Sequence, residues 1–438
     1  MGYSTIKLNL DGFKMQLRKG FLAPSLSAFD YIDRTRFAAE EDRLSDPAKT
    51  LTLSGTFDEL KKRMAPRYFN KVLLAQLEAY NYASLRFPAY KFIAPEDLAD
   101  DWLATVDFHK KYARDHSLHQ PLTAYCAASL LGFGESSKSL KIPASPGNLL
   151  EYCVNSIVER PECAYLQRYA GLMGIGKDLT NNLLKKEYWK QFFYNAVILS
   201  ALFHDIGYPW QYIRRLGKTI GDMRASEHGG QDNVDDCISI YADKLFMFPF
   251  CRYCYPPVNP PLKEGVYKRD LIKDAQGTHG LSGAQAFLTL NDMFRVYPSP
   301  SGRARQQEFS VEWAALGIMM HDLVKLNKPE REFRIDFNVD PLSSVVTMAD
   351  YLEEFERPRP EFKKSGIISY KSACRETRLS VEEDVLVVTM KYNDSRDIAT
   401  AKSFKLEETN EYFETGRGYI DMTTIGFREV KFKPELKS

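Results

Sequence analysis

One apolar segment constrains this chain more than any other. Residues 195–203 read NAVILSALF, and a helix of that composition has almost no polar face, so it must be buried. His204 and Asp205 follow it directly. An ionised aspartate at the end of a buried helix is costly unless an opposite charge compensates it, and a divalent cation is an effective compensator. Imidazole and carboxylate ligands together suit Mn, Fe, Zn or Ni.

Two further segments repeat this arrangement. Residues 311–320 read VEWAALGIMM and run into His321 and Asp322. In the helix that we predict over 341–356, Asp350 lies on an otherwise apolar face. One polar side chain on such a face is usually a hydrogen-bonded core residue. Three cases in one chain, all of them His or Asp, favour a shared metal site instead.

Histidines also stand near two predicted helix starts. Ser117 and Gln120 form an S-x-x-Q capping box, which predicts a helix that begins there and presents His119, with His116 just before it. His279 lies in the segment THGLSGA, at the start of another predicted helix. Five of the seven histidines therefore lie in helical or helix-edge contexts.

The order His, His-Asp, His, His, Asp resembles the HD-domain superfamily of metal-dependent phosphohydrolases, over roughly residues 100–358. The resemblance implies that two metals are bound by six ligands, which are His119, His204, Asp205, His279, His321 and Asp350. One metal would be held by His119, His204, Asp205 and Asp350, and the second by Asp205, His279 and His321. Asp205 would bridge the two, and a water or hydroxide between them would attack phosphorus.

Neighbouring residues have predicted roles as well, one from the resemblance and the others from their charge, position or aromatic character. His116 is placed like the proton-donating histidine of the cyclic-nucleotide phosphodiesterase branch, one residue closer to the metal ligand here. Lys325, one helical turn after His321, would neutralise a phosphate oxygen. Together with Asp205, His116 and Lys325 form the predicted catalytic set. The predicted substrate-binding residues, chosen for charge or for the ability to stack on a base, are Arg114, Tyr208, Trp210 and Arg357.

Composition excludes some functions. The chain has 438 residues, with 59 Lys and Arg against 58 Asp and Glu, and a net charge of +1 does not favour nucleic acid as a partner. No apolar stretch reaches about 18 residues, so we expect no membrane span. The N-terminus has no apolar signal-peptide core, and seven cysteines are an odd number, which fits a reducing compartment. These features predict a cytoplasmic protein.

The helical patterns predict a mainly α fold, in which an HD-type helical core carries a small C-terminal α+β appendage. Residues 1–99 would form an N-terminal helical extension and 100–360 the metal-dependent phosphohydrolase domain, with an insertion loop at 217–262. Residues 361–438 would form the appendage, with one helix at about 401–415 between β-rich segments. Within the core, Asp340 and Pro341 predict a helix start, as N-cap and first helical residue.

The leading hypothesis is therefore a phosphohydrolase that acts on a nucleotide or another small phosphate ester. Its cofactors would be two divalent metal ions, drawn from Mn, Fe, Mg, Zn and Ni. The diiron oxygenases of the HD superfamily use the same ligand types and are an alternative. A regulator that binds a nucleotide without turnover is another. A nuclease gains no support from a near-zero net charge, and the sequence leaves open whether the chain forms a homo-oligomer.

Overall fold

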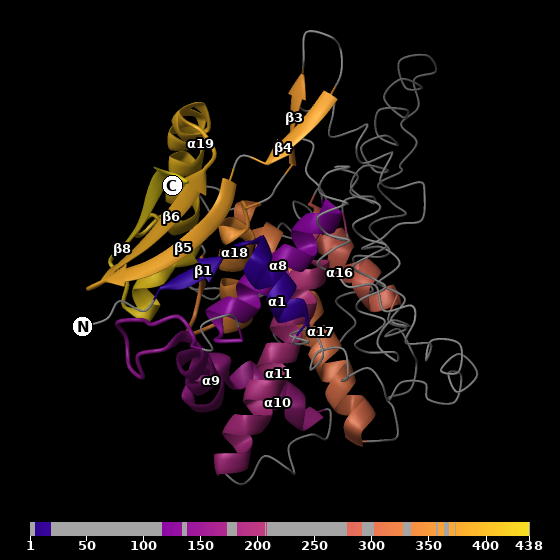
Figure 1. Cartoon of the computed structure of the whole chain (residues 1–438). Helices are drawn as coiled ribbons and strands as arrows, with labels where there is room; N and C mark the ends of the chain where they lie inside the picture. Colours follow the sequence, from indigo (N-terminus) through magenta and orange to yellow (C-terminus); the bar gives the residue numbers. More distant parts are fainter. Residues whose placement is uncertain are drawn as a thin grey trace, which may run out of the picture.

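The computed structural model describes residues 5–18, 116–133, 138–172, 182–205, 207, 278–290, 302–326, 334–355, 358–362, 368–372 and 374–437. In this part of the chain, a group of helices lies beside a four-stranded mixed sheet (Figure 1). None of the helices in the described ranges combines the length and the apolar character that crossing a membrane requires.

The helical group is organised around one long helix. Its members, in chain order, are α8 (His116–Leu130), α9 (Leu149–Glu159), α10 (Ala164–Leu172), α11 (Asn182–Phe203), α16 (His279–Leu290), α17 (Gly302–Leu323) and α18 (Pro341–Leu352). Helix α11 packs against α8, α9, α17 and α18, and α16 packs against α17. The segment 195–203 is buried on every side, as its composition predicts.

The ends of two helices test the predicted caps. Asp340 caps α18 as predicted, because its Oδ1 accepts a hydrogen bond of 3.1 Å from the backbone N–H of Ser343, and Pro341 is the first helical residue. The predicted capping box at Ser117 is wrong. Helix α8 already includes that residue, since it begins at His116.

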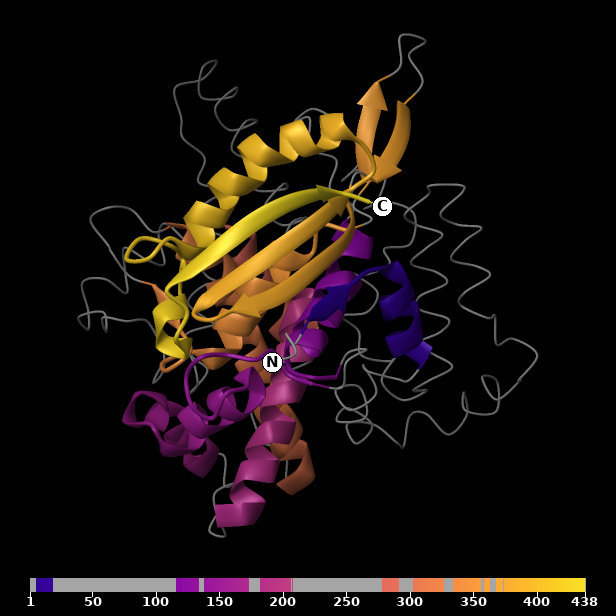
Figure 2. The ribbon, with the colours of Figure 1, turned by 60° about the vertical axis from the view of Figure 1, so that its left-hand side comes forward.

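The sheet joins strands from both ends of the chain. Its order is β1-β5-β6-β8, with bounds Ile6–Leu8, Cys374–Glu382, Val385–Tyr392 and Glu429–Leu436. Strands β1, β5 and β6 pair antiparallel, and a tight turn at Glu383, whose φ is 57°, connects the last two. Strand β8 pairs parallel to β6 after the crossover helix α19 (Ser395–Phe413), which lies against β8 and β6 (Figure 2).

The prediction of a mainly α fold is wrong. Helices account for 61% of the described residues, but strands account for 20%, and most of them build the mixed sheet. The sheet also includes the N-terminal strand, since Ile6 pairs with Leu379. Ile6 and Leu8 are buried while Lys7 between them is exposed, the alternation of a strand with one face on a core. The described part of the chain therefore has an α+β architecture.

Smaller elements complete the described structure. Two short pairs of strands lie outside the main sheet: β2 (Ile335–Asp336) with β7 (Ile420–Asp421), in parallel, and β3 (Pro358–Phe362) with β4 (Ile368–Ser372), antiparallel. Short 3-10 turns lie at Pro161–Cys163, Val324–Leu326 and Met422–Ile425.

The predicted domain boundaries remain predictions. Of the predicted extension 1–99, only β1 and α1 (Leu10–Arg18) lie within the described residues. The predicted insertion loop 217–262 lies outside them.

Candidate metal centre

The six predicted ligands come from five helices or their ends, and the fold brings them together. His119 lies in the first turn of α8, His204 and Asp205 follow α11, His279 begins α16, His321 lies in the last turn of α17, and Asp350 lies in α18. Five of these side chains are buried, and Asp350 keeps 10% of its side chain exposed.

His119, His204 and Asp350 form the first group. Nε2 of His119 lies 3.1 Å from Nε2 of His204 and 3.0 Å from Oδ1 of Asp350. Nε2 of His204 lies 3.5 Å from the same carboxylate oxygen. Ligand atoms that are each about 2.1 Å from one ion lie about 3–4 Å apart. These three side chains could therefore hold a metal ion.

A second group is formed by His204, Asp205 and His321, whose ligand atoms also lie within 4.8 Å of one another. His279 adjoins it, with Nε2 at 3.1 Å from both Nε2 of His321 and Oδ1 of Asp205. Oδ2 of Asp205 lies 3.7 Å from Nε2 of His119. Asp205 thus faces both groups, and His204 belongs to both.

The rings of His204 and His321 are oriented by backbone carbonyls of their own helices. Nδ1 of His204 lies 2.8 Å from the carbonyl oxygen of Ala201, and Nδ1 of His321 lies 2.6 Å from that of Ile318. A carbonyl oxygen can only accept, so each Nδ1 carries the proton and donates. In the neutral ring, Nε2 is then an unprotonated nitrogen directed into the centre.

The other two histidines are oriented by carboxylates. Nδ1 of His119 donates to Oε2 of Glu353, and Nδ1 of His279 donates to Oδ2 of Asp322 at 3.0 Å. Oδ2 of Asp322 also accepts from the backbone N–H of Gly280 at 3.1 Å. Carboxylates and carbonyls on the outer nitrogen are what metal-ligating histidines have in proteins, because they fix the tautomer and the ring orientation.

The protonation of the four histidines leaves a set of ligand atoms that suits a cation. All four Nδ1 atoms donate outward, so when the rings are neutral, two unprotonated Nε2 atoms face each other at 3.1 Å in the pair His119–His204, and again in the pair His279–His321. Facing lone pairs repel unless a proton or a metal ion lies between them. Carboxylate oxygens of Asp205 and Asp350 border the same space, and they add negative charge.

Burial and neighbouring charges set the protonation of the second group. Burial and the adjacent His204 and His279 lower the pKa of His321 to about 3, so this imidazole is neutral at pH 7. Burial also acts to lower the pKa of His279, but the carboxylates of Asp322 and Asp205 outweigh it and raise that pKa to about 9. A metal ion at this position would replace the extra proton.

Asp350 is held in its charged form. Burial acts to raise the pKa of its carboxyl, but the ammonium group of Lys325 keeps this pKa well below its usual range, and the adjacent imidazoles of His119 and His204 act in the same direction. Nζ of Lys325 lies 3.2 Å from Oδ2 of Asp350, and the lysine side chain is 27% exposed. Lys325 therefore lies at the edge of the centre, and its role toward a phosphate oxygen remains a prediction.

Two glycines allow the segments around the centre to approach closely. A Cβ atom on Gly207 would lie 1.9 Å from the carbonyl oxygen of His279, so only glycine lets the chain after Asp205 pass α16. A Cβ atom on Gly280 would lie 2.7 Å from Cβ of Asp322. The start of α16 can therefore rest directly on the end of α17.

Several predicted residues are not placed. The side chain of His116 lies outside the described part of the chain, although its backbone begins α8. The predicted substrate-binding residues Arg114, Tyr208, Trp210 and Arg357 lie outside it altogether. Their roles remain predictions.

Sequence reasoning missed two side chains at the centre. Glu353 is fully buried and contacts His119, although it belongs to the acidic run LEEFE, which is typical of a solvated surface. Tyr412 donates a hydrogen bond of 3.4 Å to Oδ2 of Asp350 from α19, which is 62 residues away in the chain. The one sequence feature that pointed to Glu353 was its position three residues after Asp350. No local feature of the sequence pointed to Tyr412.

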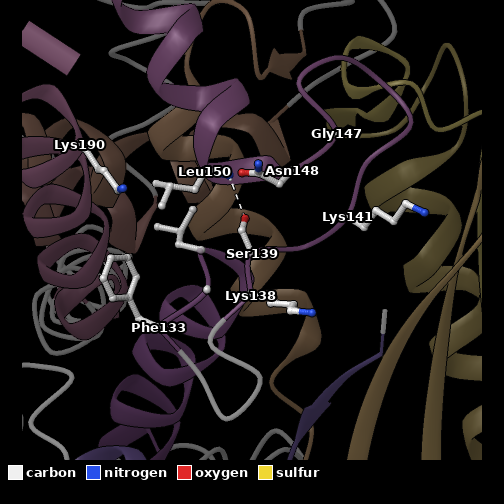
Figure 3. A pocket seen from close by; sticks show the side chains of 10 residues that line it. Phe133, Lys138, Ser139, Lys141, Gly147, Asn148, Leu150 and Lys190 are labelled. Carbon is white, nitrogen blue, oxygen red and sulfur yellow. Dashed lines mark hydrogen bonds between the residues drawn. The ribbon is translucent and has the colours of Figure 1, made fainter. Parts of the chain in front are cut away.

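A cavity of about 550 Å³ is lined in part by residues that directly follow the C-terminal end of α8, whereas His119 lies in the first turn of that helix. Figure 3 shows the side chains that line this cavity. Its lining includes Lys138, Lys141 and Lys190. Lys190 and Lys141 lie on opposite sides of Leu150, so the positive charges do not converge on one point (Figure 3). The cavity shares no residue with the metal centre, and we assign no ligand to it.

Comparison with known proteins adds no relative. No protein-family model matches the chain, and neither a curated protein nor a solved structure is found to be similar to it.

Proposed function

We propose that this chain is a metal-dependent phosphohydrolase that acts on a nucleotide or another small phosphate ester. The observation that carries the proposal is the convergence of four imidazole Nε2 atoms and two carboxylates, with Asp205 facing both groups. The resemblance to the HD-domain superfamily belongs to the proposal, because it rests on the same six residues in the same order.

The chemistry of the centre favours a phosphate ester over a neutral substrate. Divalent cations at such a centre, two of them drawn from Mn, Fe, Mg, Zn and Ni, supply Lewis acidity toward a phosphoryl oxygen and lower the pKa of coordinated water. Lys325 provides a positive charge at the edge of the site, where it would bind a phosphate oxygen as a point charge. Asp350 and Asp205 hold the negative charge that balances the cations.

The residues around the histidines keep the ligand atoms in place before any cation arrives. Glu353 and Asp322 accept from Nδ1 of His119 and His279, so neither ring can turn its Nε2 away without breaking a buried hydrogen bond. Such preorganisation is what a metal-dependent hydrolase needs, because a loosely held ligand set loses both affinity and geometry.

The test combines metal analysis with an activity screen. The purified chain is expected to contain or take up a divalent cation and, with Mn²⁺, to hydrolyse at least one member of a panel of nucleotides and other phosphomonoesters and phosphodiesters. Asp205→Ala should lose both properties. Asp384→Asn, on an exposed turn where an ion pair contributes little, should keep both.

The outcomes separate this proposal from its alternatives. If the wild type is metal-free and as inactive as Asp205→Ala, the proposal is wrong. Stoichiometric iron with a mixed-valent EPR signal and oxygen uptake would favour an HD-superfamily diiron oxygenase. Tight nucleotide binding without turnover would favour a regulator.

A further inference from the structure

The two carboxylate oxygens of Asp350 face different partners. Oδ1 points into the centre, 3.0 Å from Nε2 of His119 and 3.5 Å from Nε2 of His204. Oδ2 points away from the histidines and accepts from Nζ of Lys325 at 3.2 Å and from the hydroxyl of Tyr412 at 3.4 Å. One oxygen is thus left for a metal ion, while the other is held by two donors.

Tyr412 reaches Asp350 from α19, the crossover helix of the sheet. Its side chain is buried, and its ring packs against those of Tyr351, Phe413 and Tyr419 at centroid distances of 5.3, 5.9 and 5.2 Å. Nζ of Lys325 lies 5.8 Å from the centroid of the same ring. This packing leaves the hydroxyl little freedom to move away from the carboxylate.

Helix α19 is anchored to α18 close to Asp350. Nζ of Lys405 donates to the carbonyl oxygen of Tyr351 at 2.9 Å and lies 4.2 Å from the centroid of its ring. The hydroxyl of Tyr351 bonds Oγ1 of Thr409 at 2.6 Å. Lys405, Thr409 and Tyr412 recur at helical spacing and are all buried, so one face of α19 is fitted to the end of α18 that carries Asp350.

We propose that Tyr412 is a positioning residue of the metal centre: with Lys325 it holds Oδ2 of Asp350, so that Oδ1 alone is presented to the metal ion. The inference rests on the proposed function, because it assigns a role toward the cation that the six residues would bind. It also makes the C-terminal segment a part of the centre, since α19 lies beyond residue 361 and supplies the hydroxyl.

Hydrogen bonds from outer groups of this kind alter metal affinity by about 10–100-fold. A carboxylate that lost its donor at Oδ2 would be free to rotate and to offer both oxygens. The expected loss for one of two donors is at the lower end of that range, about tenfold. The coordination geometry should change together with the affinity.

The experiment compares Tyr412→Phe with the wild type in the full chain. The probe is Co²⁺, whose visible absorption spectrum reports ligand number and geometry, and affinity is measured by titration against a competing chelator. We expect about tenfold weaker binding and an altered spectrum, with an unchanged melting temperature of the metal-free protein. Tyr419→Phe is the matched control, because it removes a hydroxyl from the same aromatic cluster and should leave both readouts as in the wild type.

A second variant excludes a merely structural effect. In an Asp350→Asn background, which removes the charged acceptor, Tyr412→Phe should cause no further loss of Co²⁺ affinity. Equal affinity and spectrum in Tyr412→Phe and the wild type would overturn the inference alone. The inference alone would also be overturned if the losses of Co²⁺ affinity caused by the two substitutions added up fully in the double variant. A wild type that binds no Co²⁺ would overturn the inference together with the metal centre, whereas a wild type that binds Co²⁺ but hydrolyses no phosphate ester would overturn only the proposed function.

Discussion

Glu353 and Asp350 bind the two nitrogens of one imidazole, that of His119. Both carboxylates belong to α18 or its C-cap, so a single helix end supplies one candidate ligand and also orients another. The ring of His119 lies between an inner oxygen from Asp350 and an outer oxygen from Glu353. The position of α8 relative to α18 is therefore tied to the geometry of the metal centre.

Replacing Glu353 should weaken metal binding without touching a ligand. Glu353→Ala removes the acceptor at Nδ1 of His119, and we expect about 10–100-fold lower affinity for Mn²⁺, measured by titration against a chelator. Glu353→Gln should lose less, because its amide oxygen can still accept from Nδ1. Glu382→Ala, at an exposed position, serves as the control. Affinity of Glu353→Ala equal to that of the control would contradict the prediction.

The close contact of α16 with α17 predicts that alanine affects stability differently at two glycines. In Gly280→Ala the new methyl group would lie 2.7 Å from Cβ of Asp322 and 2.9 Å from the carbonyl oxygen of Met319, so the helices must shift. We expect a loss of about 1–3 kcal/mol in the free energy of unfolding. Gly171→Ala, in α10 with no atom within 4 Å of its new methyl group, should be neutral or stabilising by up to about 1 kcal/mol. Urea denaturation of both variants measures their free energies of unfolding, and equal values would contradict this prediction.

The sequence predicted the residues of the centre better than the architecture around them. A polar residue at the end of an apolar helix, as at His204 and His321, is a local signal, and the order of these signals pointed to one shared site. Glu353 could not be recognised in the same way. Its acidic neighbours indicate a surface, whereas the structure buries its side chain completely.

The C-terminal strands of the sheet belong to the predicted α+β appendage, but the N-terminal strand was missed because its pairing is not local. Strand β1 has three residues, too few for a clear alternation, and it pairs with β5 at the far end of the chain, where Ile6 meets Leu379. Strand β5 reads CRETRLSVE, whose charged residues hide its pattern. Strand β6 could be predicted with its observed bounds, because Val385–Tyr392 is rich in β-branched residues.

Lys405 is a buried cation whose removal should destabilise the fold. Its Nζ lies 2.7 Å from Glu408 and 3.7 Å from Glu354, and only 5% of its side chain is exposed. Lys405→Ala leaves a buried carboxylate without this partner, and we expect a loss of about 3–5 kcal/mol in the free energy of unfolding. Lys402→Ala, exposed on the same helix, should change it by less than about 0.5 kcal/mol. Similar melting temperatures for the two variants would show that α19 does not depend on this ion pair.

Asp340 combines the capping of α18 with a buried negative charge. Its Oδ1 accepts from the backbone N–H of Ser343, but among the described residues Oδ2 has no hydrogen-bond partner. Burial raises the pKa of this carboxyl to about 7, and the negative charge of Asp336 adds to the effect, while the hydrogen bonds from Ser343 act against it. The N-cap of the helix that carries Asp350 thus titrates near neutral pH.

Stability should therefore fall as pH rises toward neutrality. The carboxyl of Asp340 has a pKa near 3.8 when unfolded and about 7 when folded, so the folded state binds more protons between these values. Its contribution is complete at low pH and is lost as pH rises, by at most about 1.4 kcal/mol per pH unit.

Asp340→Asn keeps a good N-cap without the charge. We expect the free energy of unfolding of the wild type, relative to that of Asp340→Asn, to decrease by about 2 kcal/mol from pH 5 to pH 7. Urea denaturation of both proteins at these pH values measures this difference, with Asp384→Asn as the exposed control. A constant difference would mean that Asp340 is ionised throughout this range.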